Sequence, residues 1–212
     1  MTPQEIVRRF PRLYHVTEPG AHESVRRHGL LSTVALLDLF ETPECDRLRL
    51  LHARRPEPVP LSHPVHGEAI LNDQRPLSMK ALESCLDDGM APADWLGMLN
   101  GKVFFWPDEK QLQRLTQARA NRARQREVLV FDTARLLEDS FDRLRLSPIN
   151  TGNTMRRPAR RGLATFALAK DHAWEDWRAL RGGRDNVVEV AIDHRVASAG
   201  EALVEVRRVG EA

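Results

Sequence analysis

The order of helix-like and strand-like segments constrains the fold of this chain more than any single motif does. Segments with helical periodicity crowd the first half of the sequence, and apolar strand-like segments crowd the second half. A doubly wound parallel sheet needs strands and helices that alternate along the chain. The pattern therefore predicts an α+β fold with a split, mixed or antiparallel sheet and a helix-rich N-terminal half.

Local periodicity and turn residues place these segments more closely. Helices are expected at residues 21–28, 34–40, 43–54, 77–86, 92–99, 107–124, 134–138 and 173–180. Strands are expected at residues 12–17, 102–106, 128–131, 143–146, 186–192 and 202–208. Two stretches are expected to be loops, residues 56–66 because they contain four prolines and residues 147–163 because they are polar and basic.

Composition indicates one ordinary globular domain over residues 1–212. Hydrophobic residues make up 42% and charged residues 29%, which excludes wholesale disorder. No stretch approaches the roughly 20 apolar residues of a membrane span, and the polar first ten residues are unlike a secretory signal. Cys45 and Cys85 have neither metal-site nor disulfide-framework spacing. We therefore expect a cytoplasmic protein without a membrane partner.

The common catalytic motifs are missing from the sequence. It contains no GxxxxGK[ST], GxGxxG, HExxH or GxSxG segment, so the phosphate-loop, Rossmann, zincin and hydrolase classes lose their main support. His63 and His66, with His52 nearby, lie in or beside the proline-rich stretch and have no cysteine partner. We interpret them as loop histidines and expect no metal.

The most informative motif opens the chain. Residues 13–17 read LYHVT, and after a predicted helix residues 28–33 read HGLLST. This opening resembles the NAD-binding start of the ADP-ribosyltransferase superfamily, and is most similar to DarT-type DNA ADP-ribosyltransferases and RNA 2′-phosphotransferases. The whole chain also resembles an uncharacterised bacterial family with a YHxT opening, an LNxxVFFW segment (residues 99–106) and a SPINxG loop (residues 147–152).

The resemblance implies an ADP-ribosyltransferase-like domain that uses NAD as co-substrate. It assigns dinucleotide binding to His15 and Thr17, with Ser32 as a further contact. A neutral imidazole on a rigid strand can bond a ribose hydroxyl, which makes the assignment chemically reasonable. The residues alone equally fit a packed, hydrogen-bonded core histidine.

Two further elements follow from the same resemblance. The aromatic strand at residues 102–106 offers Phe105 and Trp106 for stacking on nicotinamide, although one phenylalanine of this strand must face the core because strand residues alternate. Glu189, between valines on a late strand, is implied as the catalytic carboxylate. The pattern also allows an exposed Glu189 that pairs with Arg207 or Arg208 across neighbouring strands.

Arginine is the unusual component of the charge. The net charge is only +2, but four of the 32 basic residues are lysines, which leaves 28 arginines. They cluster at residues 114–126 and 156–161, where they suit phosphates and bases or simply form a solvated face. The candidate substrate-binding residues in and around the second cluster are Asn150, Thr151, Asn153, Arg157, Arg160 and Arg161.

Together these features predict transfer of ADP-ribose from NAD to a nucleic-acid base, or to a protein side chain, with release of nicotinamide. Expected partners are NAD, DNA or RNA, and for a toxin-like protein an antitoxin. A catalytically inactive module that binds nucleic acid or a nucleotide through its arginines is the alternative. An RNA 2′-phosphotransferase, with Arg160 and Arg161 at the phosphate, ranks last.

Overall fold

The computed structural model describes residues 1–116, 124–155, 158–180 and 186–210 and has an α+β fold built on two main antiparallel sheets. The first sheet has the order β1–β6–β11, with strands Arg12–Thr17, Arg126–Asp132 and Leu203–Val209. The second has the order β5–β9–β7–β8, with strands Lys102–Phe105, Glu189–Asp193, Leu144–Ser147 and Ala167–Leu168. The predicted fold class is confirmed at this level.

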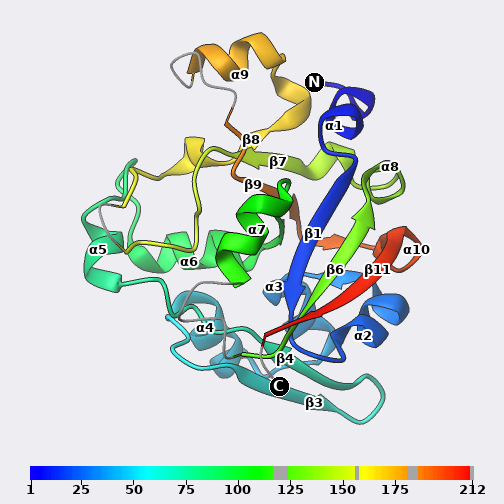
Figure 1. Ribbon diagram of the computed structural model, residues 1–212. Helices are drawn as coiled ribbons and strands as arrows, with labels where there is room; N and C mark the ends of the chain where they lie inside the picture. Colours follow the sequence, from blue (N-terminus) through cyan, green and yellow to red (C-terminus); the bar gives the residue numbers. More distant parts are fainter. Residues whose placement is uncertain (117–123, 156–157, 181–185, 211–212) are drawn as a thin grey trace.

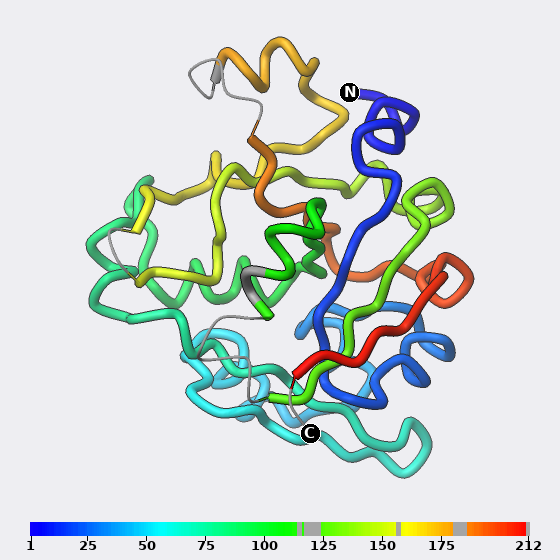
Figure 2. The backbone as a smooth tube through the Cα atoms, in the orientation of Figure 1, coloured from blue at the N-terminus to red at the C-terminus, as the bar shows by residue number. Residues whose placement is uncertain are grey.

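The two main sheets meet at a single bridge between the end of β5 and the middle of β1. The backbone N–H of Tyr14 donates to the carbonyl of Trp106 at 3.0 Å, and the N–H of Trp106 donates back at 2.8 Å. Beyond this bridge the sheets part. In Figure 1, β1, β6 and β11 run side by side, whereas β7 and β9 lie to the upper left of β1 and run in a different direction. The tube in Figure 2 shows the first and last strands flanking β6.

Helices and two small two-stranded sheets surround the main sheets. The α-helices are α1 (Pro3–Arg9), α2 (Ala21–His28), α3 (Thr33–Leu39), α4 (Glu44–His52), α5 (Met79–Glu83), α6 (Pro92–Asn100), α7 (Glu109–Thr116), α8 (Thr133–Leu136), α9 (Trp174–Leu180) and α10 (Ala199–Ala202). Short 3-10 helices cover Phe141–Arg143, Leu163–Thr165 and Ala169–Asp171. The minor sheets pair β2 (Leu30–Leu31) with β10 (Arg195–Val196), and β3 (Val59–His63) with β4 (Gly67–Leu71).

Local sequence explains the segment between α2 and α3. Helix α2 ends at Gly29, whose φ of +75° favours glycine, and a Cβ there would lie 2.4 Å from the carbonyl oxygen of Val196. Ser32 then caps α3, because its hydroxyl accepts a bond from the N–H of Ala35 at 3.2 Å. The tight turn and the cap lead from α2 through β2, which contacts β5, into α3.

The expectation of an irregular loop at residues 56–66 is wrong. Residues 59–63 form β3, which pairs with β4 in a hairpin at the lower edge of Figure 1. Pro60 lacks an N–H, but β3 has one neighbouring strand and its other edge needs no donor. The expected helix at residues 77–86 is shorter and corresponds to α5, and part of the helix expected at 107–124 lies outside the described residues.

The main core lies between the two large sheets and the helices that cover them. Phe105, Phe131, Val190 and Trp177 belong to one cluster of buried side chains, and each is at most 1% exposed. The core therefore fixes β5, β6 and β9, the strands that position the cavity described next.

No helix in the described ranges is both long and apolar enough to span a bilayer.

Candidate functional site

A cavity of about 690 Å³ opens where the two main sheets part, a size typical of small-molecule and cofactor sites. Its floor comes from β1, β5 and β9, and its walls come from α2, β2, the start of α3, β4 and the end of α6. The residues expected to act in ligand binding or catalysis that line it are His15, Thr17, Ser32, Trp106, Thr151 and Glu189. These residues come from five separate places in the sequence.

Other predicted residues lie elsewhere. Phe105 is 1% exposed and packs edge-to-face on Phe131 in the core, with ring centroids 5.8 Å apart, while its neighbour Phe104 lines the cavity. Asn150 and Asn153 belong to the loop after β7 but are absent from the cavity lining. Arg157 lies outside the described residues. Because side chains alternate along β5, Phe105, expected in the site, faces the core, and Phe104 lines the cavity in its place.

His15 is held in one tautomer by the backbone of β5. Its Nδ1 lies 2.8 Å from the carbonyl oxygen of Phe104. A carbonyl only accepts, so Nδ1 carries the proton and Nε2 is left as an acceptor. Burial lowers the pKa of His15, against the smaller effect of that hydrogen bond. The ring is therefore neutral at physiological pH and offers a hydrogen-bond acceptor.

The backbone of Val16 is a candidate binding group that the sequence analysis did not name. The N–H and C=O of Tyr14 point away from β6, toward Trp106. Because these directions alternate along an antiparallel strand, the N–H and C=O of Val16 also point away from β6. The bridge pairs Trp106 with Tyr14, two residues before Val16, and Val16 lines the cavity. The edge of β1 thus presents a donor and an acceptor side by side.

Glu189 is the buried carboxylate of the site. It is the first residue of β9, is 6% exposed and lines the cavity. Thr151 donates to its Oε2 twice, from the hydroxyl at 2.6 Å and from the N–H at 3.1 Å. Burial raises the pKa of Glu189 to about 7, although the two bonds from Thr151 and the charge of Arg161 oppose the rise. Both bonds end on Oε2, and no described residue donates to Oε1.

The exposed alternative for Glu189 is wrong. Its strand pairs with β5 and β7, whereas Arg207 and Arg208 lie on β11 in the other sheet. Arg207 instead forms ion pairs with Glu109 and Glu205. The carboxylate is therefore buried beside a loop threonine and has no cross-strand arginine partner on β11.

Arg161 acts inside the protein as a clamp on the loop that carries Thr151. The side chain is 2% exposed and donates to the carbonyls of Thr151 at 2.8 Å, Asn153 at 3.1 Å and Ala159 at 3.1 Å. Burial lowers its pKa. Arg160 is exposed and forms an ion pair with Asp87. The guanidinium of Arg161, expected at a substrate phosphate, is thus engaged by backbone oxygens.

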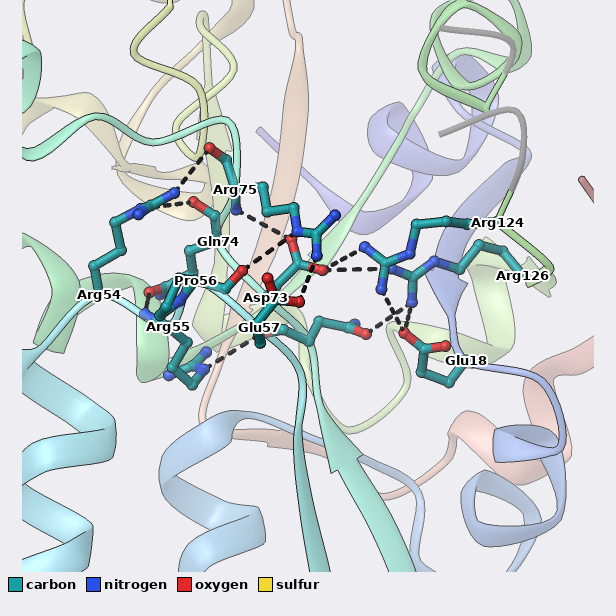
Figure 3. Close-up of polar contacts among 11 residues, drawn as sticks. Glu18, Arg54, Arg55, Pro56, Glu57, Asp73, Gln74, Arg75, Arg124 and Arg126 are labelled. Carbon is teal, nitrogen blue, oxygen red and sulfur yellow. Dashed lines mark hydrogen bonds and ion pairs between the residues drawn. The ribbon is translucent and has the colours of Figure 1, made fainter. Parts of the chain in front are cut away.

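Two members of the other arginine cluster, Arg124 and Arg126, are also engaged by carboxylates. Arg124 and Arg126 both form ion pairs with Glu18 and Asp73, and Arg126 donates to the side chain of Asn72 at 3.1 Å. Figure 3 shows the two guanidinium groups between the two carboxylates. Arg119 and Arg122 lie outside the described residues. This network joins the end of β1, the segment after β4 and the start of β6.

The start of α2 lines the cavity, and a carboxylate of the protein itself, that of Glu127, already bonds to it. Glu127 of β6, which is 1% exposed, accepts from Nδ1 of His22 at 2.9 Å. Burial alone would raise the pKa of Glu127, but hydrogen bonds from the backbone at Gly20 and from His22 lower it overall.

Within the described ranges, no group of three or more His, Cys, Asp or Glu side chains is arranged to hold a metal ion.

These features define an α+β protein with a cavity between two antiparallel sheets and a floor that carries a neutral histidine and a buried glutamate. Residues 11–203 match the model of a family described as "Family of unknown function (DUF7002)", and the chain belongs to that family. No curated protein and no solved structure matches the chain.

Proposed function

We propose that the cavity binds NAD and that the protein transfers ADP-ribose from NAD to an acceptor, with release of nicotinamide. One observation carries this proposal. His15 and Glu189 are 174 positions apart in the sequence, yet both line one cavity together with Thr17, Ser32 and Trp106. Five of the six residues assigned to NAD by resemblance, all but Phe105, thus line one cavity, within a fold that would be a split-sheet member of the ADP-ribosyltransferase superfamily.

The polar groups of the floor suit the parts of a dinucleotide. Nε2 of neutral His15 accepts a bond from a ribose hydroxyl. The adjacent N–H and C=O of Val16 pair with a primary carboxamide, the polar group of nicotinamide, which itself has donors and an acceptor. Trp106 lies where the two sheets meet and supplies an aromatic face for the cationic ring.

Glu189 supplies the charge that the reaction needs. The bond between ribose C1′ and the nicotinamide nitrogen breaks, and its electron pair leaves with nicotinamide. Positive charge develops on the ribose, and a carboxylate bonded to the 2′-hydroxyl stabilises it. A lone pair of the acceptor then forms the new bond to C1′, and the acceptor's proton passes to the carboxylate or to water. Oε1 of Glu189 can take this role because Thr151 donates to Oε2 and no described residue donates to Oε1.

The acceptor in this proposal is a nucleic-acid base or, second to it, a protein side chain. An inactive module that binds nucleic acid through arginines has less support. Arg124 and Arg126 are engaged by carboxylates and Arg161 by backbone carbonyls. These three side chains are not available to a phosphate backbone without giving up those contacts.

The test combines product analysis with a matched pair of variants. Purified protein is incubated with NAD and with DNA, RNA or protein, nicotinamide is measured by chromatography, and acceptors are analysed by mass spectrometry for one added ADP-ribose. We expect Glu189→Gln to slow release at least about 100-fold while NAD still raises the melting temperature. Glu83→Gln, an exposed change on α5, keeps the parent rate. Equal rates in parent and Glu189→Gln, or neither nicotinamide release nor a thermal shift at millimolar NAD, would overturn the proposal.

A further inference from the structure

The β3–β4 hairpin forms a wall of the cavity and is held differently at its two ends. His66 and all of β4 (Gly67–Leu71) line the cavity. The end of the hairpin where β4 runs on to residues 72–74 is called its base here. The turn between His63 and Gly67 is called its tip. The chemistry at the base is insensitive to pH near neutrality, and the chemistry at the tip is not.

Arginines hold the base. Asp73 forms ion pairs with Arg124 and Arg126, as Figure 3 shows. Arg55, which is 7% exposed, donates to the carbonyl of Asn72 at 3.2 Å, and its N–H donates to the side chain of Gln74 at 2.9 Å. Arginine stays protonated in proteins at every physiological pH. The base therefore stays attached across the neutral and mildly acidic range.

Histidines hold the tip. The rings of His63 and His66 stack with centroids 4.6 Å apart, and His28, the last residue of α2, meets His66 edge-on at 5.3 Å. Phe40, which ends α3, packs against both hairpin histidines with centroids 6.0 and 6.2 Å away. The tip thus joins α2 and α3 through three imidazoles and one aromatic ring.

The contacts at the tip require neutral histidines. Nδ1 of His63 accepts from the N–H groups of Val65 and His66 at 3.2 and 3.3 Å, and a proton on that nitrogen would remove both bonds. Nε2 of His28 is buried with no hydrogen-bond partner among the described residues. Burial, His66 and Arg27 together lower the pKa of His28. Protonation therefore breaks the turn and places positive charges against each other.

The surrounding charges do not compensate this change. Arg27 on α2 is positive and acts on His28. Glu41, just after α3, has a carboxylate oxygen 3.9 Å from Nε2 of His63, and its side chain is 83% exposed. Glu68 follows on β4 and forms no ion pair with the tip among the described residues. One exposed carboxylate, screened by solvent, faces up to three imidazolium groups and an arginine.

We propose that the hairpin tip is a pH-sensitive cover of the cavity, closed when His28, His63 and His66 are neutral and released when they are protonated. Release frees the wall formed by β4 while the base remains attached, so that mild acid opens the cavity. The movement of the tip is inferred from these contacts, while Val59, Leu61 and Leu71 pack in an apolar cluster with α3 and α4 and stay with the base. Regulation of NAD access by that movement rests on the proposed function.

Hydrogen–deuterium exchange read by mass spectrometry tests the movement without any nucleotide. Labelling at about pH 7.5 and about pH 5.5 brackets the ordinary titration range of histidine, with labelling times matched for intrinsic exchange. We expect amides of residues 59–71 to exchange at least about tenfold faster at acid pH, while those of β1 and β9 do not become faster. Equal protection of residues 59–71 at both pH values would overturn the proposal.

A double variant shows whether the tip histidines cause the effect. His63→Asn keeps an acceptor for the turn, and His66→Phe keeps the aromatic packing, but neither side chain titrates. Because His28 is retained, we expect the acid effect on exchange of residues 59–71 to become much smaller in this variant than in the parent, whereas His172→Asn, at a histidine outside the cluster, behaves as the parent does. An acid effect of the parent's size in the double variant would contradict the proposal. If the variant does not fold, the parent measurement still decides. The exchange measurement uses no nucleotide, so a protein without NAD turnover would still show the pH effect on residues 59–71.

Discussion

The floor and the cover of the cavity are built in opposite ways. The floor uses backbone: His15 and Glu189 lie on strands of the two main sheets, and their orientation follows from ladder pairing and from bonds to Phe104 and Thr151. The cover is a two-stranded hairpin attached to the rest of the protein by side chains, charged at its base and aromatic at its tip. A change in the floor should therefore alter chemistry, and a change in the cover should alter access.

The largest effect is expected from the clamp under the floor. Arg161→Met removes the donors to three carbonyls in a buried site, and each unsatisfied polar group costs about 1–3 kcal/mol. We expect the free energy of unfolding, measured by urea denaturation, to fall by about 3 kcal/mol or more. Arg160→Met is the matched control, because its exposed ion pair with Asp87 contributes at most about 1 kcal/mol. Equal losses in the two variants would contradict the clamp.

Burial of Glu189 predicts that the stability of the floor depends on pH. Its pKa is about 7 in the folded protein against an ordinary value of 4.5, so the folded state binds more protons between these values. Stability from this group is complete below its unfolded pKa and is lost as pH rises through about 7. We expect the free energy of unfolding of the parent to fall by on the order of 3 kcal/mol relative to Glu189→Gln between about pH 4.5 and 8. Identical pH profiles in urea denaturation would show that the carboxylate is not held in this environment.

A smaller effect is expected at the base of the cover. Asp73→Asn weakens the ion pairs with Arg124 and Arg126, and hydrogen bonds between charged groups contribute about 2 kcal/mol. We expect a loss of about that size in thermal or urea unfolding, together with faster amide exchange in β4 at every pH. Asp87→Asn, at an exposed pair, should change stability by less than about 1 kcal/mol. Unchanged exchange in β4 would mean that the ion pairs do not anchor the hairpin.

The smallest change concerns the hydroxyl that holds Glu189. Thr151→Val removes the 2.6 Å bond, which favours the ionised carboxylate, so the pKa of Glu189 rises further. Because the proposed reaction uses the ionised form, the acidic limb of the rate–pH profile should move to higher pH by about one unit. Thr154→Val is the control, since Thr154 is equally buried but bonds Ser78. A shift of the same size in both variants would remove Thr151 from its positioning role.

The sequence predicted the floor better than the cover for a physical reason. Strand alternation and the YHxT motif are local signals, and they placed His15 and Thr17 on a strand that lines the cavity. Alternation could not tell which phenylalanine of β5 faces the core, because both sides of that strand are covered by protein. The hairpin was missed because the four prolines of residues 56–66 predict a loop, and no local sequence pattern reveals that residues 59–63 pair with β4. Arg161 has the same sequence signature as the exposed Arg160, so its burial follows only from the folded loop.

Calorimetric titration of NAD tests the central claim, that the floor of this one cavity binds the dinucleotide. We expect one NAD per chain in the parent protein. His15→Phe removes the Nε2 acceptor and the bond to Phe104, and we expect binding at least about tenfold weaker, with the melting temperature used to confirm folding. Arg160→Met should bind as the parent does. The absence of binding heat in the parent, or unchanged affinity in a folded His15→Phe protein, would contradict the account.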